Sequence, residues 1–563
     1  MTATHSTMRA DAGPWTPGGR TSIPILVAGL LLAPCAFPAL RAQERDGAGS
    51  EAAAASRRAD DPAVIDTVIF VRDDIFTKRD ARKSFVFRLM NDVHVTTQPY
   101  VIRREVLVRP GRPYDPRQAA ETERNLRSSL LFRDVDVDTA TVDGRLALVV
   151  HTLDAWSIKP RTDLRVASDG TLTGTFGATE RNVLGTGNVV RVWYVKQVDR
   201  DGLVTAAGLP RIGGSRAGVG GTFLNLSDRT AGSWGAGPAF RSFADRWSVV
   251  ASGRAFDGRV LQYRTRSPAS RDTIEWQRRA FVNRLDWAFA PRASARGYLR
   301  VGGGFEVRRE EYFLRSVPGA SVPDTVYGLV GAWVEYRHAN YRKLRRFNGF
   351  NEEDQDLSPV AFFGVKLAPG GWGYRRTGVG LRTLLAAGHQ AGRWLLKARF
   401  DAIGLFNGAG LDSGRVSARW TAALRSTPRH VSLVSLAGGV LENPPPGGEV
   451  DLGFHVPPRL WAPHSFTGTR SIGLTAEHRW FARDDIFHLL GVGAGAFLDY
   501  GGAWFRGQGA RAGGDVGLSL FIGSPVGAFP QISQLSAGYL FGGGIGGSGD
   551  SRWGVSLSSG VHF

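Results

Sequence analysis

The sequence predicts an all-β transmembrane antiparallel barrel of about 16 strands, preceded by a small α/β domain. Two observations support this prediction. Apolar and polar side chains alternate with a period of two from Trp156 to Phe563, which is typical of strands with one apolar face. The longest apolar run is far shorter than the ~18 residues that a membrane helix needs. The chain is therefore expected to cross a membrane with strands.

Composition excludes several other classes of protein. The 73 glycines have no Gly-X-Y period, which excludes a collagen-like protein. The 31 phenylalanines, 15 tryptophans and 12 tyrosines are too many for a disordered chain. A single cysteine rules out a disulfide framework and a thiolate metal site. The net charge of +19 would fit a nucleic-acid-binding protein, but the basic residues are scattered along the chain. Scattered arginines fit a polar lumen or lipid phosphates, so no nucleic-acid partner is expected.

The N-terminus has the order of a secretory signal peptide. Arg9 and Arg20 precede an apolar stretch from Ile23 to Ala33, and the small residue Ala42 follows. Residues 1–42 are therefore expected to be removed. Residues 43–63 are small, charged and aperiodic, which indicates a flexible linker.

Residues 64–155 carry the pattern of a small α/β domain. Asp115 and Pro116 are the residue types that open a helix, at its N-cap and first turn. An Asp143-Gly144 turn separates two later strands. The expected order is strand, helix, helix, strand, strand, over Val64–Val71, Pro99–Val108, Asp115–Phe132, Val135–Asp138 and Leu146–Val150.

Residues 156–563 are expected to form the barrel. In Arg246–Ala255, Trp247 and Val249 share one face, and the arginines lie on the other. Tyr298–Val307 and Trp394–Ala402 alternate in the same way. A sandwich could show this pattern too, but charges recur in the middle of strands of about ten residues, as in a polar lumen. At roughly 25 residues per strand with its connection, the segment predicts about 16 strands.

One arginine, Arg459, and two carboxylates, Glu477 and Asp499, are expected to meet inside the barrel. Alternation places Glu477 and Arg479 on the inner face of one strand and Asp499 on the inner face of the next. The proline-rich connection before them contains Arg459. An arginine that reaches two carboxylates there would form charge-assisted hydrogen bonds and fix the connection. The alternative is that these are unrelated charges lining a pore.

The chain resembles a known family over residues 64–563. "GRPYDPRQAAETERNLRSSLLFRDVDV" resembles a POTRA domain, in which 72–98 would be an insertion. "ERNVLGTGN", "AEHRW", "AFLDYGGAW", "GDVGLSLFIGSPVG" and "GVHF" resemble strands of the BamA/TamA superfamily of outer-membrane assembly barrels, which is related to the bacterial surface antigens.

The resemblance implies roles for individual residues. In the family, a loop arginine inserts into the barrel beside an aromatic residue and a glycine. Here Arg459 is the matching arginine, with Arg470 as its rival, although leucine replaces the motif glycine. The supporting loop residues would be Trp461, Phe466 and Gly468, and the terminal signal read by the assembly machinery would be Trp553, Val555, Leu557, Gly560, Val561 and Phe563.

The expected function is non-enzymatic: assembly, insertion or translocation of polypeptides at the outer membrane of a Gram-negative-type bacterium. The first and last strands would pair weakly, so that an unfolded client adds strands at this seam while the periplasmic POTRA domain holds it. The expected partners are outer-membrane lipids, unfolded outer-membrane or secreted polypeptides, and accessory periplasmic lipoproteins. A porin-like channel and a single-client exporter are the alternatives.

Enzyme chemistry has no support in the motifs. The sequence lacks a Gly-x-Ser-x-Gly elbow, a Walker loop and a His-Glu-x-x-His pair. Asp484, Asp485 and His488 are expected in a solvated turn, and Asn351–Asp356 in an ordinary acidic loop rather than a calcium site. No cofactor and no metal are expected.

Overall fold

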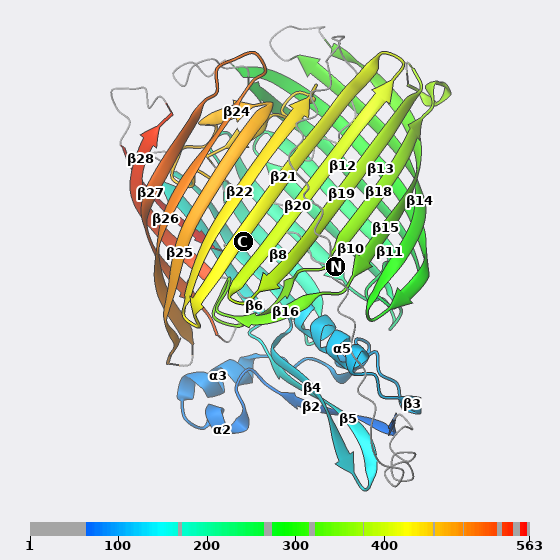
Figure 1. Ribbon diagram of the computed structural model, residues 1–563, viewed down its shortest axis with the longest axis vertical. Coiled ribbons are helices and arrows are strands. Elements are labelled where there is room, and N and C mark those ends of the chain that lie inside the picture. The colour runs from blue at the N-terminus through cyan, green and yellow to red at the C-terminus, as the bar shows by residue number, and fades with distance from the viewer. Residues whose placement is uncertain are drawn as a thin grey trace, which may run out of the picture.

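The computed structural model describes residues 63–166, 172–263, 273–314, 321–374, 376–453, 457–487, 489–525, 532–543 and 552–559. Within these ranges a closed barrel lies above a small α/β region in Figure 1. The expected signal peptide, residues 1–42, and nearly all of the expected linker, residues 43–63, lie outside the described residues. Both stay predictions.

The α/β region is a three-stranded sheet packed on short helices. Asp115 caps the longest helix by accepting the N–H of Arg117, and Leu126 of that helix is fully buried on the sheet. In the sheet, β5 lies between β2, which is parallel to it, and the antiparallel β4. The elements are β1 Val64–Ile65, β2 Thr67–Asp73, α2 Lys78–Ala81, α3 Phe85–Val93, α4 Pro99–Arg103, β3 Arg112–Pro113, α5 Pro116–Ser128, β4 Phe132–Val142 and β5 Arg145–Asp154.

The structure departs from the expected elements of this region at two points. The first strand is split at Asp66 into β1 and β2. The helix expected over Pro99–Val108 ends at Arg103, because the next residues are held by tertiary contacts: Leu107 donates its N–H to Thr122, and Val108 is buried in the core. The segment 72–98 holds the two additional helices α2 and α3. None of the helices among the described residues is long and apolar enough to span a membrane.

The barrel closes in chain order, with β29 paired to β6. Every neighbouring pair is antiparallel. The strands are β6 Ile158–Val166, β7 Leu172–Val183, β8 Asn188–Lys196, β9 Asp201–Leu209, β10 Ala217–Leu226, β11 Arg229–Pro238, β12 Trp247–Tyr263, β13 Thr273–Ser294, β14 Gly297–Leu314, β15 Ser321–His338, β18 Val360–Ala368, β19 Gly378–Ala391, β20 Trp394–Asn407, β21 Gly410–Thr427, β22 His430–Glu442, β25 Arg470–Ile486, β26 Leu490–Trp504, β27 Ala512–Gly523, β28 Ile532–Gly542 and β29 Trp553–Ser559.

The expected number of about 16 strands is wrong, because the closed barrel has 20. The 408 residues from 156 to 563 divided by 20 strands give roughly 20 residues per strand with its connection. The assumed spacing of ~25 residues is too long because many hairpins turn tightly. Only Ser227 and Asp228 separate β10 from β11, and only Gly392 and Arg393 separate β19 from β20.

The two faces of the strands differ as the alternation predicts. On β12, Trp247 and Val249 are 49% and 40% exposed, whereas Ser248 between them is buried. On β14, Val301 and Phe305 lie outside, and Arg300 and Glu306 are buried inside. The outside of the barrel is thus apolar, and its inside is charged and polar.

Two further hairpins are not part of the barrel wall and lie at its two ends. The first, β16 Tyr341–Arg345 with β17 Glu352–Asp356, connects β15 to β18 at the end nearest the α/β region, here called the domain end. The second, β23 Val450–Leu452 with β24 Phe466–Gly468, connects β22 to β25 at the far end, near the top of Figure 1. A short 3-10 turn, η1 Gly370–Trp372, lies between β18 and β19.

Candidate functional site

The connection 443–469, here called the lumen loop, folds onto the inner face of the late strands. Its apolar side chains drive this docking: Leu460, Trp461 and Phe466 are buried with Phe497 of β26 and Leu540 of β28. Glycines occupy the positions of the inner wall where the loop lies closest. A Cβ on Gly513 or Gly543 would lie about 2.4–2.5 Å from the Trp461 ring, so the tryptophan fits only because both residues lack a side chain.

Arg459 of the lumen loop lies between the two carboxylates named in the sequence analysis. Its Nε donates to Asp499 Oδ2 at 2.5 Å, its Nη2 to Asp499 Oδ1 at 3.1 Å, and its Nη1 to Glu477 Oε2 at 2.8 Å. The side chains of Glu477 and Asp499 are 1% and 0% exposed. The guanidinium also stacks 4.1 Å from the centre of the Phe497 ring. Such bidentate, desolvated pairing is the strong form of an ion pair.

A third carboxylate, Asp515 of β27, also holds the loop and was missed in the sequence. Its Oδ2 accepts the N–H of Leu460 at 2.7 Å, and the neighbouring Trp461 Nε1 donates to Gly514 O at 3.0 Å. Asp515 lies directly opposite Asp499 in the ladder and is fully buried. The signal for it was available, because the alternation that places Asp499 inside also places Asp515 inside.

Arg470 and Gly468 lie at the base of the loop rather than beside the carboxylates. Arg470 begins β25, where its Nη2 donates to Glu442 at 3.2 Å and its Nη1 to Leu441 O. A Cβ on Gly468 would lie 2.3 Å from the backbone of Trp504, so this glycine allows β24 to lie against β26. Of the two arginines, Arg459 is the one that enters the barrel.

The loop also reaches strands on the opposite side of the β6–β29 junction. His464 Nε2 lies 3.1 Å from Asp199 in the β8–β9 turn, and its Nδ1 lies 2.7 Å from Asp451. Its ring stacks on Tyr263 at the end of β12. Burial lowers the pKa of His464, but hydrogen bonds to Asp199 and Asp451 outweigh burial and raise it to about 9. The imidazolium therefore clamps the loop between two carboxylates at neutral pH.

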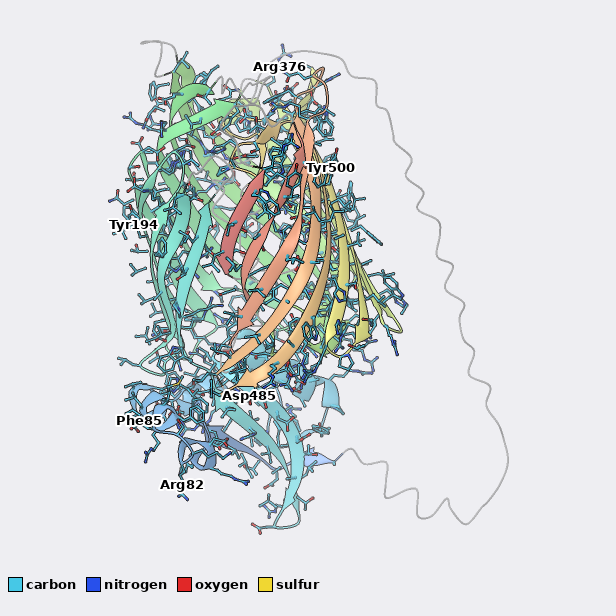
Figure 2. The ribbon with its side chains drawn as sticks, turned by 90° about the vertical axis from the view of Figure 1, so that its left-hand side faces the viewer. Arg82, Phe85, Tyr194, Arg376, Asp485 and Tyr500 are labelled. Carbon is cyan, nitrogen blue, oxygen red and sulfur yellow. The ribbon has the colours of Figure 1, made fainter. Side chains whose placement is uncertain are left out.

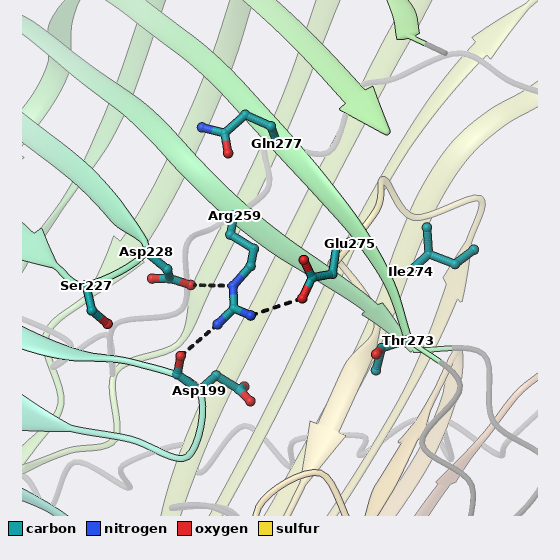
Figure 3. A pocket seen from close by; sticks show the side chains of 8 residues that line it. All are labelled: Asp199, Ser227, Asp228, Arg259, Thr273, Ile274, Glu275 and Gln277. Carbon is teal, nitrogen blue, oxygen red and sulfur yellow. Dashed lines mark hydrogen bonds and ion pairs between the residues drawn. The ribbon is translucent and has the colours of Figure 1, made fainter. Parts of the chain in front are cut away.

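A pocket of about 800 Å³ lies beside this clamp (Figure 3). Its polar groups are engaged with one another: Arg259 donates to Asp228 at 3.2 Å, to Glu275 at 3.1 Å and to the carbonyl of Asp199 at 2.7 Å. The arrangement ties the β8–β9 and β10–β11 turns to strands β12 and β13. It fastens the far end of the barrel.

The charges continue from the loop to the domain-end hairpin. Glu477 accepts a second hydrogen bond, from Arg479 Nε at 2.7 Å, and Arg479 Nη1 lies 3.4 Å from the carbonyl of Phe347. Phe347 and Phe350 of the hairpin are buried against Phe481 and Phe521 of the barrel wall. This hairpin, which the sequence analysis did not foresee, therefore packs into the domain end of the barrel.

The acidic residues of the hairpin serve structural contacts. Glu353 accepts the Asn348 N–H at 2.6 Å, Asp354 pairs with Arg127 of α5 at 3.0 Å, and Asp356 pairs with Arg337. Asp484 pairs with Arg346, whereas His488 lies outside the described residues. Among the described residues, no group of three or more His, Cys, Asp or Glu side chains could hold a metal ion.

The junction of β6 with β29, here called the seam, contains three residue pairs among the described residues. Leu164, Arg165 and Val166 lie opposite Leu557, Ser556 and Val555. Trp553 and Val555 are 65% and 45% exposed on the outer face. Gly560, Val561 and Phe563 lie outside the described residues, so the expected terminal signal is only partly visible.

No family model and no curated protein matches the chain. Solved structures do resemble it. CdiB from Escherichia coli has a TM-score of 0.44 and 10% identity over 88% of this chain and 76% of that one. BamA from Haemophilus ducreyi, lacking POTRA domains 1–3, has a TM-score of 0.33 and 12% identity over 88% and 84%. The FrpB iron transporter from Neisseria meningitidis has a TM-score of 0.40 and 9% identity over 76% and 86%.

The chain is an outer-membrane type of β-barrel. Its similarity to CdiB and BamA is structural and distant, and its neighbours also include a metal-ion transporter. The barrel that the resemblance implied is present in the structure. What the barrel does rests on its own geometry.

Proposed function

We propose that the protein is an outer-membrane factor that assembles, inserts or translocates polypeptides, acting without an energy cofactor at the β6–β29 seam. A client strand would pair with an edge exposed when the seam opens. Each unpaired backbone N–H or C=O group of the client costs several kcal/mol in lipid. Pairing at the seam would give these groups the hydrogen bonds of a β-ladder. No covalent step is part of this mechanism.

The observation that supports the proposal most is that the lumen loop binds both sides of the seam. On the C-terminal side, Arg459 and Leu460 bind β25, β26 and β27, and Leu460 packs where a Cβ on Gly554 of β29 would lie. On the N-terminal side, His464 binds the β8–β9 turn. A loop anchored in this way controls whether the two halves of the wall can separate.

The α/β region would hold a client below the barrel. It is fixed there by polar contacts: Arg211 of the β9–β10 turn pairs with Glu105 at 2.9 Å, and the buried Glu121 of α5 accepts from Ser242 at 2.7 Å. The β2 and β4 edges of its sheet are free of a neighbouring strand among the described residues. Unfolded outer-membrane or secreted polypeptides, and accessory periplasmic lipoproteins, are the partners that this proposal implies.

A passive channel is the second candidate, and a feature of the lumen favours it. Asp401 of β20 is surrounded by Arg382, Arg399 and Arg415 at 3.6, 3.9 and 3.4 Å, and these arginines are 46%, 55% and 49% exposed. Because alternation directs them inward, they line a wet part of the lumen. Such a cationic wall suits the passage of small anions.

Depletion of the protein followed by quantitative proteomics of the outer membrane distinguishes the candidates. Loss of many barrels supports insertion, and loss of one secreted protein supports export. Unchanged outer-membrane and secreted proteomes, together with reduced uptake of a small anion, would overturn the proposal in favour of a channel.

A further inference from the structure

Helix α3 exposes an apolar stripe that nothing in the described chain covers. Phe85, Val86, Leu89 and Val93 are 70%, 45%, 47% and 63% exposed. At 100° per residue these four positions fall within one arc of about 100°. The opposite face of α3 packs against the rest of the α/β region, because Phe87 is buried with Ile75 and Phe76. The exposed stripe is therefore a second apolar face, beyond what the fold requires.

Basic side chains are concentrated in the sequence just before this stripe. Between residues 78 and 88 the chain carries Lys78, Arg79, Arg82, Lys83 and Arg88, all exposed, against one acidic residue, Asp80, which is paired with Lys83 at 2.5 Å. Asp92 is a further acid on α3. An apolar stripe with Phe and Leu, flanked by a cationic surface, is the pattern of a helix that lies in a membrane interface.

The segment contacts two turns of the barrel that expose apolar side chains. Leu489 of the β25–β26 turn packs into the core beneath α3, and the same turn exposes Phe487 at 84%. On its other side, Gln98 donates its N–H to Gly185 of the β7–β8 turn, next to Leu184, which is 72% exposed. Figure 2 shows Phe85 closer to the strand ends than Arg82.

We propose that α3 lies in the leaflet adjoining the domain end of the barrel, with its apolar stripe among the acyl chains and its basic residues on anionic phospholipid headgroups. Continuity with Phe487 and Leu184 selects lipid as the occupant, and the positive charge selects anionic headgroups. The β25–β26 and β7–β8 turns flank the seam, so the membrane contact lies below it. This inference is independent of the proposed function.

The test uses the full-length protein reconstituted in phosphatidylcholine–phosphatidylglycerol bilayers that contain brominated lipids. In a Cys35→Ser background, an environment-sensitive fluorophore is attached at Leu89→Cys. The matched control is Val142→Cys, an exposed apolar position of the same α/β region at the tip of the β4–β5 hairpin, which points away from the barrel (Figure 1). We expect bromine to quench the Leu89 probe several-fold more than the Val142 probe.

Lipid charge gives the second readout. Replacing phosphatidylglycerol by phosphatidylcholine, or changing Lys78, Arg79, Arg82 and Lys83 together to glutamine, should reduce the quenching at Leu89. Correct folding of each variant is checked by heat-modifiable migration of the barrel. Equal quenching at Leu89 and Val142 would overturn the proposal, and quenching that is insensitive to lipid charge would overturn the role of the basic residues.

Discussion

Arg459 is the residue on which the lumen loop depends. Its two carboxylate partners come from neighbouring strands, β25 and β26, and are almost fully buried. Arg479 also bonds Glu477, whereas Arg459 is the cation that balances Asp499, and an unpaired buried charge loses several kcal/mol of solvation. Arg459 therefore fixes the loop to the barrel wall.

Arg459→Ala should weaken the folded barrel by about 3–5 kcal/mol, since it leaves Asp499 buried without its cation and removes one of the two arginines that bond Glu477. The measurement is the temperature at which the barrel loses its compact migration on gels. Arg470→Ala is the control, because Arg470 pairs with Glu442, which is 18% exposed, and should cost about 1 kcal/mol or less. Equal temperatures for the two variants would count against the role of Arg459.

Reversing the ion pair tests direct contact. Arg459→Asp and Asp499→Arg should each lower the heat resistance, and combining them should restore part of it, because a cation again faces an anion across the loop. Rescue will be incomplete, since Glu477 also bonds Arg459. A double variant as weak as the sum of the single variants would argue against direct pairing.

His464 should make the loop sensitive to alkaline pH. The folded-state pKa of about 9 lies above the ordinary value of about 6.5, so its contribution is complete below about pH 6.5 and is lost as the pH rises through about 9. His464→Phe keeps a ring beside Tyr263 but no charge. The melting temperature of the native protein should fall toward that of the variant between about pH 7 and 10; a constant difference would contradict the clamp.

At the scale of elements, the sequence predicted which face of a strand points into the barrel better than it predicted the connections between strands. Alternation identified the inward direction of Glu477, Arg479 and Asp499, because one-sided burial leaves a period of two in each strand. It could not give the number of strands, since turn lengths vary without changing that period. It also missed the β16–β17 hairpin, whose packing depends on contacts with Phe481 and Phe521, more than a hundred residues away.

The β16–β17 hairpin should restrict passage through the domain end of the barrel. Phe350 of its turn is buried against Phe481 of β25. Phe350→Ala should cost about 3–5 kcal/mol of local packing and raise the conductance of the protein in planar bilayers. Phe363→Ala, which removes a ring 49% exposed on the outer face of β18, is the matched control. Equal conductance in both variants would show that the hairpin does not close the lumen.

At the scale of the whole molecule, the lumen loop at the far end and the segment 72–98 at the domain end each contact parts of the barrel on both sides of the seam. The barrel is thus bridged across its β6–β29 junction at each end. A wall that merely encloses a pore needs no such bridges, because its ladder already closes it. This arrangement is the central reason for placing polypeptide handling at the seam.

The most direct measurement locks the seam with a disulfide. Leu164 and Leu557 are opposite residues of β6 and β29, and Leu436 and Leu474 are opposite residues of β22 and β25, so the two double-cysteine variants are a matched pair. Each variant is expressed in cells depleted of the native protein, and the cells are grown with and without reductant. We predict that only the Leu164→Cys/Leu557→Cys variant loses outer-membrane or secreted clients, and that reductant restores them. Full activity with a completely oxidised seam would contradict the account.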